Sequence, residues 1–600
     1  MRPERLLVLA LVVWAFATVG AYLAARSYSS LVTEPAPPPS AIAWSLAALE
    51  RGGATERPPA DALSYRAAGP VVVLAFVGGR VVARHEGDPS LVASVRGAIA
   101  SFAANPRLAP GLSTADDGPR VRYSITVPLG EGAIVVDVPG LDLLQLVALR
   151  DGIAVRHQGR RVALVPDELV DLDLYDEGFV TPLPEIYVGV PMPRIVGTLA
   201  VRLGIPAERL LREGRFTRFA ARTYSRDTYP RRRPVTQANV RRAIGEMTDY
   251  LVRSEHDGRF DYLFDARAGR PYGIAYYSLP RHAGTTYFLG QAARVLGRDD
   301  ARAAAERAFG WMLRFRTVSC GAPDRLCVVE GNAGDVGATS LAVVAGTELA
   351  RTVGVERLRP VLDAYGAFLL SQQRPDGEMQ HDYDLANHRP VDVQYLYYSG
   401  EAALALLRLH EATSDRRYLG AARRLLEHLA TKTWEFPGSR YVYNEEHWTC
   451  IALGESDGRL DLPALRDFCR RVYLWNDGLQ YRRGEGPWDA EGGYGVTPFL
   501  VPRTPPVGTR GEAFVAAYGA LARHGQAPEG MRAHLDRDVS MLLAWQYSPG
   551  PTRFFADPPR VRGGMPGGPI DPDVRNDFVQ HAGSALVRWL ELREAELSAR

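Results

Sequence analysis

The stretch Tyr397-Tyr-Ser-Gly-Glu-Ala-Ala-Leu-Ala-Leu-Leu-Arg-Leu-His-Glu-Ala-Thr-Ser-Asp-Arg-Arg-Tyr-Leu419 decides the fold of the C-terminal part of the chain. It opens a helix with glycine and small residues, from Gly400 to Leu406, and an Arg-rich amphipathic helix follows from Ala421 to Ala430. Small side chains let one helix crowd against its neighbours, whereas an amphipathic helix buries one face only. The pattern therefore predicts a hairpin of one inner and one outer helix.

This pattern belongs to an internal repeat. Asp257-Gly258 is followed eight residues on by Asp265, and Asp376-Gly377 is followed eight residues on by Asp384, which gives an offset of 119 residues. A weaker third copy begins at Asp477-Gly478. Repeated supersecondary units stack on one another to bury a shared core.

Six helix starts of the inner kind follow along residues 236–600. The start near His447 has no glycine, and the other five open at Gly284, Gly337, Gly400, Gly511 and Gly583. Six hairpins of about 60 residues each predict an all-α (α/α)6 toroid, with the long loops gathered on one face around a central cavity.

The Tyr397–Leu419 segment resembles the hairpins of the (α/α)6 carbohydrate-active superfamily, which includes glycoside hydrolases, polysaccharide lyases and sugar epimerases. The resemblance covers residues 236–600 as architecture and implies a carbohydrate ligand. It does not choose a reaction, because one fold hosts many chemistries.

Residues 61–230 have an α+β pattern. Val71–Val77 and Arg80–Ala83 predict a hairpin across Gly78-Gly79, and Ser90–Ala104 predicts a helix. The later strands include Gly152–Arg156.

The order of these pieces resembles the AMMECR-type family. The resemblance rests on Leu91-Val-Ala-Ser-Val-Arg96, Asp151-Gly-Ile-Ala-Val-Arg156 and Ile195-Val-Gly-Thr-Leu-Ala-Val-Arg-Leu-Gly-Ile-Pro206. The Arg-Gly-Cys-Ile-Gly stretch of that family is absent, and Ala83-Arg-His-Glu-Gly87 stands in its place. The resemblance implies a fold, and a binding or docking role, more than a reaction.

The first thirty residues predict a signal anchor. Leu6 to Ala25 is a run of twenty residues without a charge, which at helical rise spans a bilayer core. A cleaved signal peptide is the alternative, and either one exports the bulk of the chain. The Pro-rich residues 31–60 then predict a stiff linker. The expected location is the inner membrane, with a single pass and the bulk in the periplasm.

The four cysteines fall into two local pairs. An even number in short loops predicts two disulfides in an oxidising compartment, Cys320 with Cys327 and Cys450 with Cys469. Four unrelated buried thiols are the alternative.

Composition excludes several functions. Basic and acidic residues number 71 and 69, so the net charge of +2 gives no reason to expect a nucleic acid partner. Lys432 is the single lysine, which argues against a P-loop and against pyridoxal chemistry. We expect no cofactor, and because the cysteines pair with each other, no metal.

Candidate site residues lie ahead of the inner helices and in the repeated loops. Two carboxyl groups and a titratable base are what glycan chemistry requires, and tyrosine stacks on sugars or acts as an acid. The predicted catalytic residues are Asp384, His282, Asp265, Tyr398 and Glu401. The predicted substrate-binding residues are Arg281, His381, Tyr395, Tyr397, Asp335, His447, Glu446, Arg510, Glu512, His581 and Asp577. Helix capping and Asx turns are the structural alternative for these residues.

The leading hypothesis is a membrane-anchored periplasmic protein that binds and modifies an envelope polysaccharide or glycoconjugate by hydrolysis, elimination or epimerisation. The rival is a non-catalytic scaffold or assembly factor of an envelope protein complex. Two carboxylates and a histidine gathered at the toroid mouth would favour the enzyme.

Overall fold

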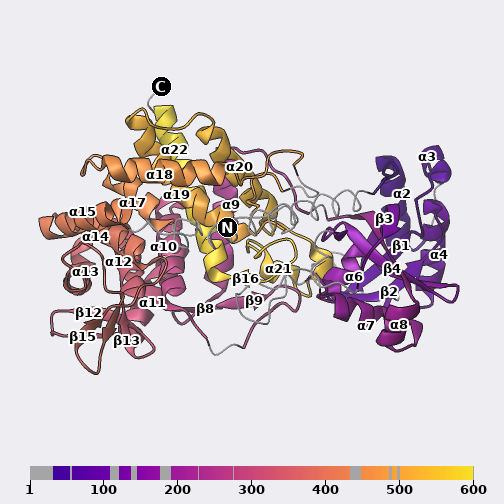
Figure 1. The fold of residues 1–600 in the computed structure, drawn as a ribbon, viewed down its shortest axis with the longest axis horizontal. Coiled ribbons are helices and arrows are strands. Elements are labelled where there is room, and N and C mark those ends of the chain that lie inside the picture. The colour runs from indigo at the N-terminus through magenta and orange to yellow at the C-terminus, as the bar shows by residue number, and fades with distance from the viewer. Residues whose placement is uncertain are drawn as a thin grey trace, which may run out of the picture.

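The computed structural model describes residues 31–53, 57–108, 121–136, 145–175, 191–227, 229–273, 276–432, 447–485, 490–495 and 501–598. Figure 1 shows a sheet-containing part beside a larger helical part. The predicted anchor over residues 6–25 lies outside the described residues. Within them, no helix is both long and apolar enough to cross a bilayer.

Six inner helices form a closed ring in the described part of the chain. Each packs on the next, and the last returns to the first. They are α10 (Leu279–Leu296), α12 (Val336–Val353), α14 (Tyr398–Thr413), α17 (Trp448–Ser456), α19 (Thr504–Arg523) and α22 (Asn576–Ser598). All six predicted inner helix starts fall at or within these helices, so the repeat forms an (α/α)6 toroid.

An outer helix precedes each inner helix. The outer helices are α9 (Gln237–Arg253), α11 (Asp299–Arg316), α13 (Val355–Ser371), α15 (Arg416–Thr431), α18 (Pro463–Asp477) and α20 (Met531–Trp545). α15 buries Leu425 and Leu429 while Arg423 and Arg424 face solvent, as its amphipathic sequence predicts. In contrast, α12 is buried continuously from Val336 to Ala350.

Glycines allow the inner helices to pack closely against one another. A Cβ at Gly454 of α17 would lie 2.6 Å from the carbonyl oxygen of Ala516 of α19. A Cβ at Gly508 of α19 would lie 2.9 Å from the backbone nitrogen of Ala582 of α22. Because larger residues would force these helices apart, the small-residue pattern is a condition for ring closure.

The toroid domain is not all-α as predicted, because short strands lie in its loops. The 119-residue repeat is a β-hairpin at the end of the ring where the inner helices begin. Asp265 pairs with Arg270 across one hairpin, and Asp384 pairs with Arg389 across the other in the same register. The strands are β9 (Leu263–Asp265), β10 (Arg270–Pro271), β14 (Asp382–Asp384) and β15 (Arg389–Val391). Strand β9 also pairs with β16 (Val574–Arg575), and β7 (Glu255–His256) pairs with β8 (Arg259–Phe260).

The repeated glycines make the same contact. Gly258 and Gly377 have φ of 87° and 96°, and a Cβ there would lie 2.7 and 2.6 Å from a carbonyl oxygen of the next outer helix. The predicted third copy differs. Gly478 is right-handed at the end of α18, and Gly492, with φ of 88°, makes the equivalent contact with α20.

Charged side chains fill the axis of the ring below its mouth. Arg408 of α14 donates to Glu455 of α17, with Nε 2.9 Å from Oε2, and to Glu348 of α12, with Nη1 2.9 Å from Oε2. Arg588 of α22 donates to Glu455 at 2.9 Å and to the hydroxyl of Tyr287 of α10 at 3.1 Å. This axial ionic network connects five of the inner helices.

Glu455→Gln should destabilise the protein by about 3–5 kcal/mol near neutral pH, because it breaks a buried ion pair from one side. Burial opposes ionisation of Glu455, but Arg408 and Arg588 outweigh it and hold its pKa below the ordinary value of 4.5. That stabilisation is present above pH 4.5 and is lost as the pH falls further. Urea unfolding of both proteins from pH 7 to pH 3 measures this, and a stability difference that stays constant with pH would contradict it.

Both predicted disulfides are present. Cys450 of α17 joins Cys469 of α18, and Cys320 joins Cys327 at the hairpin of β11 (Thr317–Ser319) and β12 (Leu326–Glu330). Strand β12 pairs with β13 (Ala333–Asp335), which pairs with β14, so this hairpin belongs to a five-stranded sheet.

Removing the Cys450–Cys469 bridge by a double Cys→Ala change should cost about 3 kcal/mol, and removing Cys320–Cys327 somewhat less, because loop-closure entropy grows with loop length. The sequence separations are 19 and 7 residues. Chemical denaturation of the two double variants checks the order. Equal stability of both variants and the parent would show that neither bridge constrains the unfolded chain.

The N-terminal part is a six-stranded antiparallel sheet of order β2-β1-β3-β6-β4-β5. The predicted hairpin across Gly78-Gly79 and the predicted helix are confirmed. The strands are β1 (Val72–Val77), β2 (Arg80–Glu86), β3 (Val121–Ala133), β4 (Asp151–His157), β5 (Arg160–Leu164) and β6 (Arg215–Ser225). The helices are α3 (Ala60–Ser64), α4 (Leu91–Ala103), η1 (Pro106–Leu108), α6 (Pro166–Asp171), α7 (Met192–Leu203) and α8 (Ala207–Glu213).

The stiff linker predicted over residues 31–60 is replaced in part by helix α2 (Pro39–Glu50). Trp44, Leu46 and Leu49 of this helix are buried in the core that includes α4 and β3. Pro35, Pro37 and Pro38 precede the helix and Pro39 occupies its first turn, where a missing N–H costs nothing.

The sheet docks firmly on the toroid. The ring centroids of Phe76 and Phe554 lie 5.4 Å apart, edge to face. Arg553 binds the Asp167 carboxylate through two hydrogen bonds of 2.8 and 3.1 Å, and Arg267 donates to the carbonyl of Val170 at 2.7 Å. The contact segment on the toroid side holds η2 (Thr552–Phe554) and α21 (Pro558–Val561), between α20 and β16 (Figure 1).

Candidate active site

Asp335 is the most perturbed acid at the mouth of the ring. It ends β13 and caps α12, where its Oδ1 accepts a hydrogen bond from the Ala338 backbone at 2.6 Å. Its Oδ2 lies 2.8 Å from the hydroxyl of Tyr398. The residue is 5% exposed, and this burial raises the pKa of the Asp335 carboxyl to about 7. Asp335 therefore keeps or releases a proton near neutral pH.

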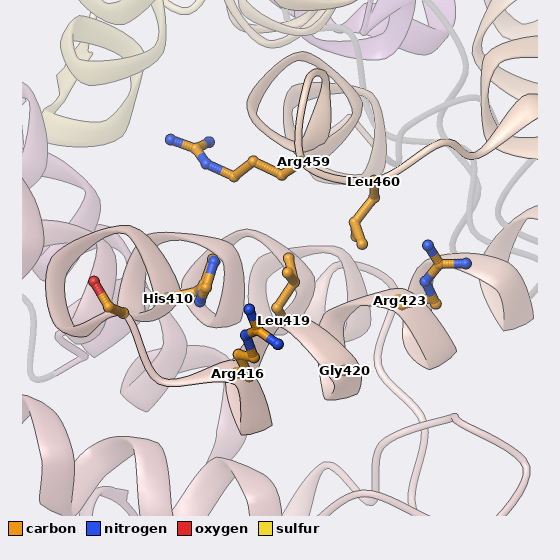
Figure 2. Close-up of a pocket in the computed structure, with 8 residues that line it drawn as sticks. His410, Arg416, Leu419, Gly420, Arg423, Arg459 and Leu460 are labelled. Atoms are coloured by element: carbon orange, nitrogen blue, oxygen red, sulfur yellow. The ribbon is translucent and has the colours of Figure 1, made fainter.

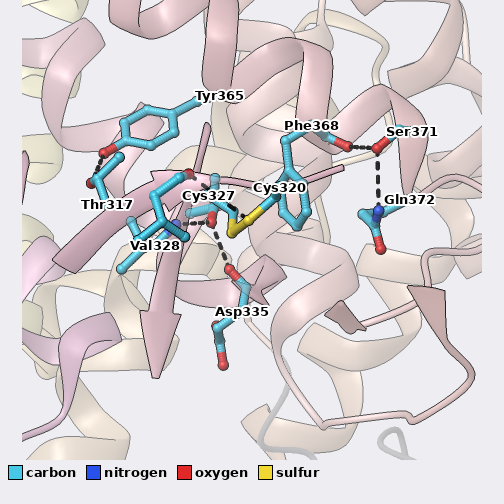
Figure 3. The surroundings of a disulfide bond; sticks show 11 residues. Thr317, Cys320, Cys327, Val328, Asp335, Tyr365, Phe368, Ser371 and Gln372 are labelled. Atoms are coloured by element: carbon cyan, nitrogen blue, oxygen red, sulfur yellow. Dashed lines mark hydrogen bonds between the residues drawn. A yellow bond between two sulfur atoms is a disulfide. The ribbon is translucent and has the colours of Figure 1, made fainter. Parts of the chain in front are cut away.

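The Cys320–Cys327 disulfide supports the backbone before Asp335. A Cβ at Gly334 would lie 2.5 Å from the Cys327 sulfur, so the bridge and the strand pack directly together. Figure 3 shows Asp335 beside the disulfide. Thr339 donates to the Asp335 carbonyl at 2.6 Å and accepts from the Val328 N–H at 2.9 Å.

Two tyrosines lie next to each other near Asp335. Tyr395 is 42% exposed, its ring centroid lies 4.8 Å from that of Tyr398, and its hydroxyl donates to Asp382 at 3.0 Å. His381 lies behind them. Its Nδ1 accepts from the Tyr395 backbone at 2.7 Å, and its Nε2 lies 2.7 Å from the Ser399 hydroxyl. Both nitrogens of His381 are thus used in positioning the tyrosines.

Glu401 supplies the second carboxylate of this cluster. It lies one turn after Tyr398 on α14 and is 4% exposed. A Cβ at Gly337 would lie 2.8 Å from its Oε2, so the glycine that opens α12 makes room for it. The structure therefore brings Asp335, Tyr398 and Glu401 together from two neighbouring inner helices.

A second cluster stands beside the first. The ligand-forming atoms of His447, Glu512 and His581 all lie within 4.8 Å of one another. Tyr397 joins the two clusters, because its ring lies 5.7 Å from that of His447 and it directly precedes Tyr398. Arg510, also predicted as a ligand-binding residue, is buried over the ring of Tyr494 at 4.6 Å. Arg510 and His447 both line a small cavity of about 10 Å³.

Arg281 and Asp577 form an ion pair at the mouth. Arg281 Nε lies 3.0 Å from Asp577 Oδ2, and Arg575 binds the same carboxylate at 2.6 and 2.9 Å. Burial favours neutral Asp577, but the two guanidinium groups outweigh it and hold its pKa below 3.8. This carboxylate stays ionised, so it is a poor proton donor.

His282 does not join either cluster. It is fully buried against Trp311 of α11, its Nδ1 lies 2.7 Å from the Tyr277 hydroxyl, and its Nε2 donates to the Ala308 carbonyl at 3.0 Å. Burial lowers the pKa of His282 to about 4. Its place two residues ahead of Gly284 correctly indicated the helix start, but its side chain packs outward between two helices.

In the structure, Asp384 and Asp265 each stabilise a turn, which was the structural alternative to the catalytic role predicted for them. Asp384 accepts hydrogen bonds from the backbones of Ala386 and Asn387 and from the Asn387 side chain, and these hold its pKa below 3.8. Asp265 accepts from the Ala268 backbone at 2.8 Å. Glu446 lies outside the described residues.

Two members of the site were missed from the sequence. Asp382 binds Tyr395, and Glu330, at the end of β12, is close enough to Asp335 to favour its protonated form. Burial raises the pKa of Glu330 itself. Neither residue lies at a helix start, so the spacing of the helix starts did not indicate them, although Asp382 lies two residues from the predicted Asp384.

No family model matches the chain, and no curated protein matches it. Among solved structures, the chain is similar to an unsaturated glucuronyl hydrolase specific for heparin, with 9% identity, coverage of 60% of this chain and 99% of that one, and a TM-score of 0.43. A sugar epimerase from a ruminal bacterium has 11% identity and a TM-score of 0.45, and the match covers 59% of this chain and 98% of that one. An uncharacterized protein from Pyrococcus horikoshii has 16% identity and a TM-score of 0.23, and the match covers 30% of this chain and 88% of that one. At these scores the likeness supports no reaction, and the architecture rests on the closed ring of helices.

The Asp335→Asn variant should become more stable relative to the parent protein as the pH rises. Because the folded carboxyl has a pKa of about 7 against an ordinary 3.8, the wild type loses stability as the pH rises through this window, and Asn does not. The variant-minus-parent difference in unfolding free energy should grow by up to about 4 kcal/mol between pH 4 and pH 8.

Urea unfolding at the two pH values measures this difference. Asp384→Asn is the matched control, because its carboxyl has a lowered pKa and should show no such growth. A difference for Asp335→Asn that does not change with pH would contradict a buried, proton-holding carboxyl.

Proposed function

We propose that the toroid is a glycan-modifying enzyme that uses Asp335 as its proton donor. The observation that carries the proposal is the buried Asp335 carboxyl, whose pKa reaches about 7 at the end of the ring where the inner helices begin. A carboxylic acid that retains its proton near neutral pH can protonate the oxygen of a glycosidic bond.

The neighbours of Asp335 supply the other groups that glycoside cleavage needs. Glu401 is the second carboxylate, in the role of base or nucleophile. The exposed ring of Tyr395, beside Tyr398, offers an apolar face on which a sugar ring can stack, with Asp382 at its edge to accept a hydroxyl.

The reaction begins with proton transfer from Asp335 to the leaving oxygen. Tyr398, 2.8 Å away, holds the acid in place and stabilises the carboxylate that forms by donating its hydroxyl proton in a hydrogen bond. If Glu401 is the nucleophile, it forms a glycosyl-enzyme, and Asp335 regains its proton from the water that hydrolyses it. If Glu401 is the base, it takes the proton of the attacking water, and Asp335 is reprotonated from solvent as Glu401 releases that proton. Of the three reactions considered from the sequence, hydrolysis uses these groups most directly.

The cellular setting belongs to the same proposal. An uncleaved anchor over residues 6–25 would hold the protein on the inner membrane, with an AMMECR-like domain and the toroid in the periplasm. The two disulfides support an oxidising compartment. The substrate would then be an envelope polysaccharide or glycoconjugate.

Asp335→Asn should lower kcat on a cleaved oligosaccharide by about 100-fold or more, the usual contribution of a general acid. Wild-type kcat should fall as the pH rises through about 7, because Asp335 must carry its proton. The full chain is incubated with acidic and neutral oligosaccharides, and new reducing ends are counted. Asp384→Asn, another loop aspartate, should keep its activity within a few-fold.

An active Asp335→Asn variant would overturn the acid role. If the folded protein neither cleaves nor binds any member of the panel, the enzyme proposal fails and the scaffold hypothesis gains. In that case the docked sheet and the toroid would act together as an interaction surface.

A further inference from the structure

We propose that His447, Glu512 and His581 bind one divalent transition-metal ion of the zinc class. Two imidazoles and one carboxylate form the donor set of catalytic zinc sites that keep an open coordination position. All three side chains are held on neighbouring inner helices, at the cap of α17, on α19 and on α22. The paired cysteines gave no reason to expect a metal from the sequence, but they take no part in this cluster.

The donor atoms are close enough for one ion. They lie within 4.8 Å of one another, with His581 Nδ1 3.4 Å from Glu512 Oε2. Ligands about 2.0–2.1 Å from a tetrahedral zinc lie roughly 3.4 Å apart. The His581–Glu512 pair already has this separation, and the other pairs must close by at most about 1.4 Å, which side-chain rotation can supply.

Glu512 provides the independent reason for a cation. It is fully buried, and its Oε1 has no hydrogen-bond partner among the described residues. Arg588 Nε is 3.7 Å away, while the shorter bonds of Arg588 go to Glu455 and Tyr287. Within the described residues, Oε1 of this buried carboxylate thus has a long ion pair and no hydrogen bond, and a bound metal ion would supply a closer partner.

The packing holds the ligands in position. A Cβ at Gly508 would lie 3.1 Å from the Cβ of His581, so the glycine permits the approach of α22 to α19. The His447 ring lies 4.8 Å from Trp448 and 5.0 Å from His581, nearly perpendicular to the latter. Aromatic walls of this kind fix imidazole orientation and exclude water, as metal sites require.

The experiment uses metal alone, so it is independent of the proposed sugar chemistry. The full chain is stripped with a chelator and titrated with Zn²⁺ against a chromophoric chelator, and with Co²⁺ while its visible absorption is recorded. We expect one equivalent of tight binding, Co²⁺ bands of a low-symmetry site, and a higher Tm with Zn²⁺.

Glu512→Gln and His581→Gln should each weaken Zn²⁺ binding by about 100-fold or more. His410→Gln is the matched control, because His410 lies at the other end of α14, in a groove with Arg416 and Arg459 (Figure 2). It should leave binding unchanged. Circular dichroism identifies any variant that fails to fold, and His447→Gln then serves as the replacement.

Either of two results overturns the proposal. The first is no tight equivalent of Zn²⁺ in the folded parent, which would leave His581 and Glu512 as an ion pair. The second is a tight equivalent that folded Glu512→Gln and His581→Gln still retain. The outcome for Asp335→Asn decides the proposed function separately.

Discussion

The axial ionic network of Arg408, Glu455, Glu348 and Arg588 is the constraint on which the toroid depends. Six helices can close into a ring only if small residues let them touch, and the central space must then be filled. This protein fills it with paired charges that connect α10, α12, α14, α17 and α22. Losing one partner of such a pair leaves the other charge buried and unpaired, which is costly. The network therefore restricts the relative rotation of the helices more than it adds net stability.

Because the ionic network fills the axis of the ring, the candidate site residues lie at its mouth. The inner helices all begin at that end, and the loops before them carry the hairpins, the Cys320–Cys327 bridge and the tyrosines. Asp335 owes its neutrality to burial in this setting, which outweighs the hydrogen bonds from Tyr398 and the Ala338 N–H that favour the ionised form. The same crowding buries Glu512 between two histidines.

The N-terminal sheet belongs to this arrangement and is not a separate body on a tether. Arg553 and Phe554 hold it against the segment between α20 and β16, and β16 leads directly into α22, which carries Asp577 and His581. Helix α2 adds to the sheet's own core instead of spacing it from the chain's start.

The sequence by itself determined the helical hairpins, the two disulfide pairs and the 119-residue repeat, because these depend on periodicity and on contacts between residues near in the chain. That the repeated segment is a β-hairpin came from the structure. It also identified Asp335, Tyr398, Glu401, His447, Glu512 and His581 as candidates. Only the tertiary structure decided which candidates meet. Ring closure turns His282 outward to α11, lets Asp384 close its own turn, and brings Glu512 to His581. Local spacing places a residue at a helix start, but the rotation of that helix within the ring decides which way its side chain faces.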